Sequence, residues 1–390
     1  MTTYAFNHSE KGVIQYKDKK RYFWLGSIFL SLLPSLTIGL YFVTNHSITL
    51  LVPLVFGYVF VPIMDYCMGT DRTNPPEEVV PQLESDSYYQ WLTFVSTPIH
   101  YFSLIASVWF VCTVPLSIEI FLLFTISVGL YSGLSINTAH ELGHKTTKIE
   151  RLLAKISLSV TGYGHFSVEH NAGHHRDVAT PEDTSSSRMG ESIYRFALRE
   201  IPGAIVRGWQ LEAQRLQRHG LPLLSHKNVI LQSYAITFLI QGGMIVLFGW
   251  KALLFLVIHN AVAWFQLTSS NYIEHYGLLR SKSADGKYEH CKPHHSWNAN
   301  HIFSNLMLYQ LERHSDHHAN PLRRYQSLRS FDGLPELPSG YFGMYFIAYF
   351  PWLWFNVMDK RLLAVPHING DLSKVNLDPK KAPSLIEKYA

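Results

Sequence analysis

His140-Glu-Leu-Gly-His144-Lys145 begins the segment that is most informative about the fold of this chain. The segment ends with Glu169-His170-Asn-Ala-Gly-His174-His175. Two histidines four residues apart on a helix lie one turn apart on the same face, so both can reach one metal ion. A third cluster follows at His314-Ser-Asp-His317-His318. Three tight clusters in a largely apolar chain are hard to explain by packing alone, and together they predict a metal site.

The charge distribution predicts a membrane protein. The 390 residues are 47% hydrophobic and only 16% charged, whereas a typical soluble domain is about 25% charged. Lys and Arg are absent from four windows, 22–71, 73–144, 228–250 and 252–279. A helix that crosses a bilayer needs about 20 apolar residues, so the first two windows can hold two spans each and the last two one each. We place the six spans near 22–44, 47–67, 91–113, 116–138, 229–249 and 252–271.

The basic residues predict the orientation. Nearly all Lys and Arg lie before span one, between spans four and five, or after span six, and the opposite side has only Lys251. The positive-inside rule makes the basic side cytoplasmic. Both termini and the segments 139–228 and 272–390 are then cytoplasmic, and the ends of spans four and six bring His140 and His144 to the same side as His275. We therefore predict a single all-α integral membrane domain, residues 1–390, with six transmembrane helices and a cytoplasmic helical cap.

Several functions are disfavoured. Cys67, Cys112 and Cys291 are too few and too scattered for a disulfide framework or a CxxC metal site. Met1–Lys20 is polar, unlike a cleaved signal peptide. The chain has no GxGxxG for a flavin or a nicotinamide, so we expect neither cofactor to be bound. The net charge of +4 suits an anionic leaflet or an acidic protein rather than nucleic acid.

Local patterns give further expectations. Span four runs without Pro into His140, which predicts one helix that carries the first histidine pair beyond the bilayer. We expect the third cluster on a helix that starts near Asn300, and an interfacial, aromatic-rich helix over 342–358.

The first cluster also fits a different enzyme. His140-Glu141-Leu-Gly-His144 matches HExxH, in which two histidines bind zinc and the glutamate is the general base of a protease. A zinc protease of the membrane is therefore an alternative. It does not account for the two additional clusters or for His275 on the same side.

The combination of HxxxH, HxxxHH and HxxHH on one side of a multispan chain resembles the membrane-bound non-haem diiron enzymes, which include fatty-acid desaturases, lipid hydroxylases and alkane monooxygenases. Within that group the chain resembles the alkane 1-monooxygenases (alkane omega-hydroxylases). The most discriminating string is Asn271-Tyr-Ile-Glu-His-Tyr-Gly-Leu278, beside Asn137–Lys145, Glu169–His175 and Leu311–Ala319. Glu312 departs from the family pattern, which has glutamine there.

The resemblance implies two non-haem irons held by nine histidines: His140, His144, His170, His174, His175, His275, His314, His317 and His318. It implies hydroxylation of the terminal methyl of medium- to long-chain n-alkanes with O2 and two electrons, in a bacterial inner membrane. The electrons would come from a separate rubredoxin, itself reduced by an NAD(P)H-dependent rubredoxin reductase. A desaturase or hydroxylase of fatty-acyl lipids is the alternative within the same superfamily.

Other residues are candidates for supporting roles. Carboxylates that adjoin ligands can hold metal-bound imidazoles in place, and the candidates are Glu141, Glu169, Glu274 and Asp316. His290, His294 and His295 repeat the HxxxHH spacing, but Pro293 disfavours the helical turn that would bring His290 and His294 together, so we exclude them from the iron site. In span two we predict that Phe56, Gly57, Tyr58 and Phe60 border a substrate channel.

Overall fold

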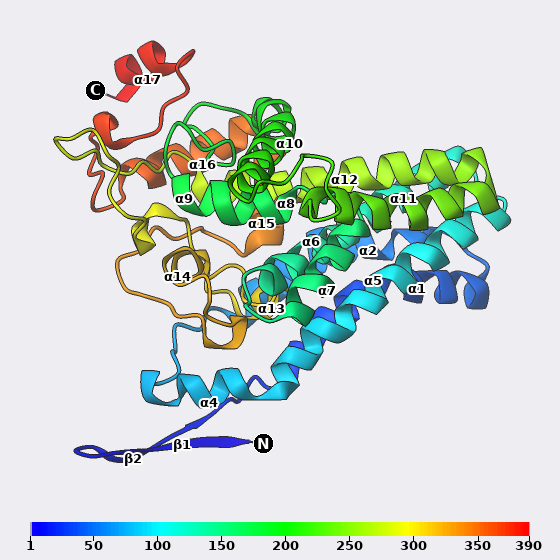
Figure 1. Ribbon diagram of the computed structural model, residues 1–390, viewed down its shortest axis with the longest axis horizontal. Helices are drawn as coiled ribbons and strands as arrows, with labels where there is room; N and C mark the ends of the chain where they lie inside the picture. The colour runs from blue at the N-terminus through cyan, green and yellow to red at the C-terminus, as the bar shows by residue number, and fades with distance from the viewer. Residues whose placement is uncertain (1, 390) are drawn as a thin grey trace.

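The computed structural model describes residues 2–389, which form a bundle of long helices capped at one end by shorter helices and loops (Figure 1). Six helical segments are long and apolar enough to cross a membrane. They are Phe23–Thr44 (η1 and α1), Ser47–Met68 (η2, α2, η3 and α3), Ser87–Thr113 (α5), Ile118–Gly143 (α6), Val229–Phe248 (α11) and Trp250–His275 (α12). The prediction of six transmembrane helices is confirmed.

The outward faces of these helices are apolar. Large side chains such as Val43, Phe102, Phe238 and Val246 are exposed on them. Such side chains lose nothing by facing lipid, and helices satisfy most of their backbone polar groups internally, as a bilayer requires. The bundle is therefore built to be surrounded by hydrocarbon.

Two glycines set the close approach of α6 and α12. A Cβ atom at Gly129 would lie 2.8 Å from the Cβ of Val262 and 2.9 Å from the carbonyl oxygen of His259. At Gly133 it would lie 3.1 Å from Cγ of Gln266. Small residues let helix backbones pack tightly in a membrane. This packing brings together the ends of the two helices that carry the first histidine pair and His275.

The cap is made of the remaining elements. Its helices are α4 (Val80–Ser85), α7 (Lys148–Ser159), α8 (Phe166–Glu169), α9 (His175–Asp177), α10 (Ile193–Arg218), α13 (Ile302–Met307), α14 (His314–Ala319), α15 (Tyr341–Ala348), α16 (Pro351–Leu363) and α17 (Ala382–Tyr389). Single turns are η4 (Glu77–Val79), η5 (His170–His174), η6 (Pro293–His295), η7 (Tyr325–Ser327) and η8 (Leu372–Lys374). Two of the η segments, η3 (Phe56–Phe60) and η5, are π-helical.

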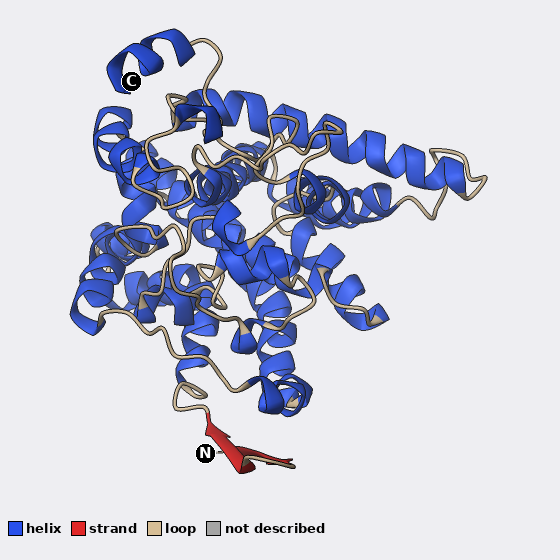
Figure 2. Ribbon diagram, turned by 90° about the vertical axis from the view of Figure 1, so that its left-hand side faces the viewer, coloured by secondary structure: helices blue, strands red, loops and turns tan. Residues whose placement is uncertain are grey.

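An antiparallel hairpin of β1 (Thr3–His8) and β2 (Gly12–Lys17) precedes the bundle. Tyr4 donates to Asp86 at 2.6 Å, and Arg21 forms an ion pair with the same carboxylate at 2.5 Å. Figure 2 shows this hairpin in red at one end of the molecule, with α17 at the opposite end.

Two local expectations are wrong. The helix expected from Asn300 through the third cluster is broken, because Tyr309 and Gln310 adopt positive φ angles of 53° and 54° between α13 and α14. The aromatic segment is two helices, α15 and α16, rather than one. Tyr345 and Trp354 are buried, whereas Phe346, Phe350 and Trp352 are exposed.

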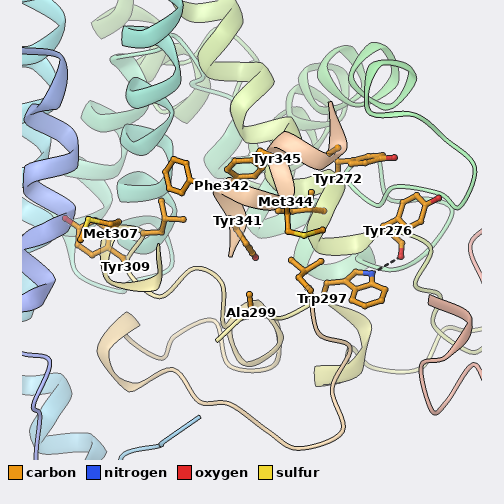
Figure 3. Packing of buried hydrophobic residues seen from close by; sticks show 14 of the residues in the cluster. Tyr272, Tyr276, Trp297, Ala299, Met307, Tyr309, Tyr341, Phe342, Met344 and Tyr345 are labelled. Atoms are coloured by element: carbon orange, nitrogen blue, oxygen red, sulfur yellow. Dashed lines mark hydrogen bonds between the residues drawn. The ribbon is translucent and has the colours of Figure 1, made fainter. Parts of the chain in front are cut away.

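The aromatic segment belongs to the largest apolar core, which joins the cap to the membrane helices (Figure 3). Trp297, in the loop after α12, donates its indole N–H to the carbonyl oxygen of Tyr276 at 2.9 Å. The same core fixes the loops that carry the third histidine cluster.

Candidate metal centre

Five histidines from four elements form the first group: His140, His144, His170, His175 and His317. Successive Nε2 atoms lie 3.2 Å apart between His144 and His170, 3.0 Å between His170 and His175, and 3.2 Å between His175 and His317. The helix α6 runs unbroken to Gly143 and presents His140 and His144 on one face, as the i, i+4 spacing predicts.

Four histidines form the second group: His174, His275, His314 and His318. The Nε2 atoms of His275 and His314 are 3.3 Å apart, and those of His314 and His318 are 2.9 Å apart. The ring of His174 completes the group, with its centroid 4.8 Å from that of His275. The structure thus brings together all nine histidines singled out from the sequence, in two sets.

The π-helical turn η5 decides how the second cluster is divided. In an α-helix His170 and His174 would share a face, but a π turn closes between residues five apart. His170 accordingly joins His175 in the first group, and His174 faces the second. In α14, with α-helical spacing, His314 and His318 share the second group and His317 turns to the first.

The donor set fits metal ions. Two imidazole nitrogens that bind one ion at about 2.1 Å lie roughly 3 to 3.4 Å apart, depending on the coordination angle. The Nε2 contacts in both groups, 2.9 to 3.3 Å, fall close to this range. A neutral histidine ring has one N–H donor and one acceptor nitrogen. When several rings point their nitrogens at one another, these nitrogens cannot all be paired by hydrogen bonds between the rings. A cation at the centre of each group satisfies them.

Burial keeps these rings in the form that binds metal. Burial, followed by the charge of neighbouring histidines, lowers the pKa well below its ordinary value in His144, His170, His175, His314, His317 and His318. Neutral imidazole is the ligand form. The six rings therefore keep their lone pairs available at neutral pH.

Asp183 orients one ring and was not singled out from the sequence. Nδ1 of His174 lies 2.8 Å from Oδ2 of Asp183, which also accepts from Ser186, and Arg207 pairs with the other carboxylate oxygen at 3.1 Å. Burial alone raises the pKa of Asp183, but His174, Ser186 and Arg207 lower it below the ordinary value. A carboxylate on the outer nitrogen of a ligand fixes the tautomer of the ring. Because Asp183 lies in a loop, no periodicity or motif marks it.

Of the four carboxylates predicted to support ligands, Glu274 lies closest to a ring, with Oε2 3.3 Å from Nε2 of His314. Glu141 instead pairs with Lys145 at 3.1 Å, and Glu169 faces Arg207 at 3.6 Å. Asp316 accepts from the backbone N–H of Arg329 at 2.9 Å. An adjacent helical residue points about 100° away from its neighbour, so these three carboxylates face other elements.

An apolar cavity leads from the membrane helices to the histidines. Its walls include Leu130, Leu134, Phe342 and Tyr345, and its inner end is formed by His140, His170, Glu274 and His314. Of the four channel candidates, Gly57 and Tyr58 line it. Phe56 instead packs against Phe29 and Phe60, with ring centroids 5.8 and 4.9 Å away, and Phe60 is exposed.

Six apolar helices, nine clustered histidines and an apolar cavity that ends at both groups define a class, the multipass membrane proteins with a histidine-rich metal centre. The family model for fatty acid desaturases matches residues 117–357. Alkane 1-monooxygenase 1 of Alcanivorax borkumensis is 52% identical over 96% of this chain and 92% of its own. Alkane 1-monooxygenase of Ectopseudomonas oleovorans is 51% identical over 96% of this chain and 93% of its own. This chain belongs to the alkane 1-monooxygenase family, within the larger fatty acid desaturase family.

A more distant relative is the xylene/toluene monooxygenase hydroxylase component XylM of Pseudomonas putida, 26% identical over 60% of this chain and 62% of its own. Membership in this family decides against the HExxH protease. The geometry agrees, because Glu141 is held by Lys145 and by the backbone N–H of Tyr325.

Proposed function

We propose that this chain is a rubredoxin-dependent, non-haem diiron alkane 1-monooxygenase that converts medium- to long-chain n-alkanes to primary alcohols. The relatives carry the name alkane 1-monooxygenase over nearly the whole chain. The observation that carries the proposal is the apolar cavity whose inner end is formed by histidines of both groups.

The five-histidine group would hold one iron and the four-histidine group the other. A saturated hydrocarbon offers no lone pair and no acidic proton, and the bound irons would supply the activated oxygen that its C–H bonds require. Asp183 holds His174, and the close packing of α6 on α12 holds His140 and His275 in position.

The cavity would select the terminal methyl. Internal C–H bonds are weaker than those of a methyl group, so only a narrow site that admits the chain end first can favour the end. Tyr58, Leu134 and Phe342 line the passage, and His140 and His314 close it. An alkane dissolved in the bilayer would lie lengthwise along these walls.

The proposed setting is a bacterial inner membrane with the cap and both termini in the cytoplasm. Two observations support this setting: the chain has six helices that can cross a membrane, and nearly all Lys and Arg residues lie on the side of the cap. The donor would be an acidic rubredoxin supplied by a separate chain. Arg323 and Arg324 pair with Glu77 and Glu150 at 3.3 and 2.7 Å, so both are already used within the cap. Lys292 is also paired, with Glu289, but its side chain is more exposed than those of Arg323 and Arg324, which makes it the better docking candidate.

The test is product analysis with the full chain in membranes, rubredoxin, its reductase and NADH. We expect 1-octanol from octane and 1-hexadecanol from hexadecane. His140→Ala should abolish both products while the protein still inserts, and His219→Ala, an exposed histidine of α10's end, should not. Desaturated product from a fatty-acyl ester, with no alcohol from either alkane, would show that the chain acts on acyl lipids instead.

A further inference from the structure

A third group of metal-binding side chains lies outside the nine histidines. Glu289, His294 and His295 offer ligand atoms that lie within 4.8 Å of one another. They belong to the loop after α12 and to its turn η6. The ring of His367, from the turn after α16, faces His294 with centroids 4.5 Å apart and lies 6.4 Å from that of His295, so it has to turn inward to join the three.

The spacing of these rings matches that inside the two main groups. The centroids of His294 and His295 are 4.3 Å apart, compared with 4.2 Å for His140 and His317 in the first group and 4.5 Å for His314 and His318 in the second. Within residues 2–389, the buried Nε2 atom of His367 has no hydrogen-bond partner. An unpartnered buried nitrogen beside two other imidazoles is a second, independent sign of a missing ligand.

We propose that Glu289, His294, His295 and His367 bind one Zn2+ ion, at a structural site separate from the catalytic iron site. Three imidazoles and one carboxylate are donors that zinc accepts, and four protein ligands complete the tetrahedral shell of a structural site. The inference does not depend on the proposed oxygenation chemistry.

Two contacts have to give way when the ion binds. Lys292 forms an ion pair with Glu289, but its side chain is 53% exposed, and exposed pairs contribute little to stability. The backbone N–H of Lys292 donates to Nδ1 of His295 at 3.0 Å. Binding through Nε2 would make Nδ1 an N–H donor, and the backbone N–H of Lys292, an exposed residue, would then have to turn away to water. Both rearrangements stay within one surface turn.

The site would tie two distant parts of the chain together. Residues 289–295 precede Trp297, whose backbone N–H donates to the carbonyl oxygen of Glu274 at 2.8 Å, next to His275. His367 follows α16, which packs against α15 in the aromatic core. A bound ion would therefore stiffen the loop behind His275 without touching substrate.

The experiment uses the full-length, iron-loaded protein in lipid nanodiscs, equilibrated with buffered Zn2+ and then washed. Iron and zinc per chain are counted by mass spectrometry, and Tm is measured with and without Zn2+. Glu289→Gln keeps the shape of the side chain and removes its charge, and His294→Ala removes a ligand. His290→Ala is the matched control, because His290 is exposed in the same loop and belongs to none of the groups found in residues 2–389.

We expect one tightly held zinc beyond the iron in the wild-type protein and in His290→Ala. Glu289→Gln and His294→Ala should bind that zinc about tenfold or more weakly, lose the zinc-dependent rise in Tm and keep their iron. No zinc beyond the iron in the wild-type protein, or equal zinc loss in His290→Ala, would overturn the site. Iron loss from Glu289→Gln in parallel with zinc loss would show that the group belongs to the catalytic centre.

Discussion

Glu312 is a buried carboxyl near the proposed metal site, and its surroundings favour the protonated form. It accepts from the backbone N–H of Tyr341 at 2.9 Å and from the side chain of Asn305 at 3.2 Å. Burial, and then the charge of Asp65, raise its pKa well above the ordinary 4.5. The family pattern that the chain resembles has glutamine here, and a protonated glutamate is likewise neutral, with a carbonyl acceptor and a hydrogen-bond donor. The departure from the family pattern therefore keeps a neutral group at this buried position.

We predict that Glu312→Gln stabilises the protein at pH 8 and does so less at pH 5.5. A carboxyl whose pKa is raised by folding contributes fully below its unfolded pKa, and the contribution is lost as the pH rises. Glutamine needs no proton, so the variant should gain roughly 1 kcal/mol at pH 8, on the order of 2 °C in Tm. Thermal unfolding in nanodiscs at both pH values measures this. An equal Tm difference at the two pH values would refute the titration account.

At the level of elements, the π turn η3 places Gly57 against the cavity. A Cβ atom there would lie 3.1 Å from the hydroxyl of Tyr131 and 3.4 Å from the ring of Phe342. We predict that Gly57→Trp shortens the cavity, so that turnover of hexadecane falls at least about tenfold while octane is still hydroxylated.

Phe60→Trp is the control, since Phe60 lies one turn away in the same span and is exposed. Chain-length profiles from gas chromatography of the alcohols give the result. If Gly57→Trp keeps the wild-type ratio of 1-hexadecanol to 1-octanol, span two does not limit the substrate.

The elements differ in how well the sequence predicts them. The membrane helices are predictable because about 20 consecutive apolar residues have few other stable folds. The break between α13 and α14 is not, because Tyr309 and Gln310 adopt left-handed angles that glycine normally takes. The extent to which α15 and α16 enter the core was not predictable, since aromatic residues suit a membrane interface and a protein core equally well.

For the whole molecule, the proposed orientation predicts the outcome of reporter fusions. A fluorescent protein that folds only in the cytoplasm should fluoresce when fused after the last residue. An alkaline phosphatase inserted at Gly249, between α11 and α12, should be active, because that turn lies at the opposite end of the bundle from the cap. Phosphatase activity at the C-terminus with none at Gly249 would reverse the topology.

The nine histidines of the metal centre could be predicted from the sequence. Eight of them stand in clusters with a recognisable spacing, and the resemblance to the family pointed to His275. Their division into groups of five and four could not be predicted, since it depends on a π turn and on the packing of α6 against α12. Asp183 and Arg207 could not be found either, because only the tertiary fold brings the loop after α9 and the helix α10 to His174.

The neighbours His174 and His175 face different groups, and so do His317 and His318. Each pair is one rigid piece of backbone, so a cation that orders one member also sets the direction of the other. The second ion then meets ligands whose conformational entropy has already been lost, which makes its binding stronger than the first. We expect filling to be nearly all or none, with chains that hold a single metal ion rare at every stage of assembly.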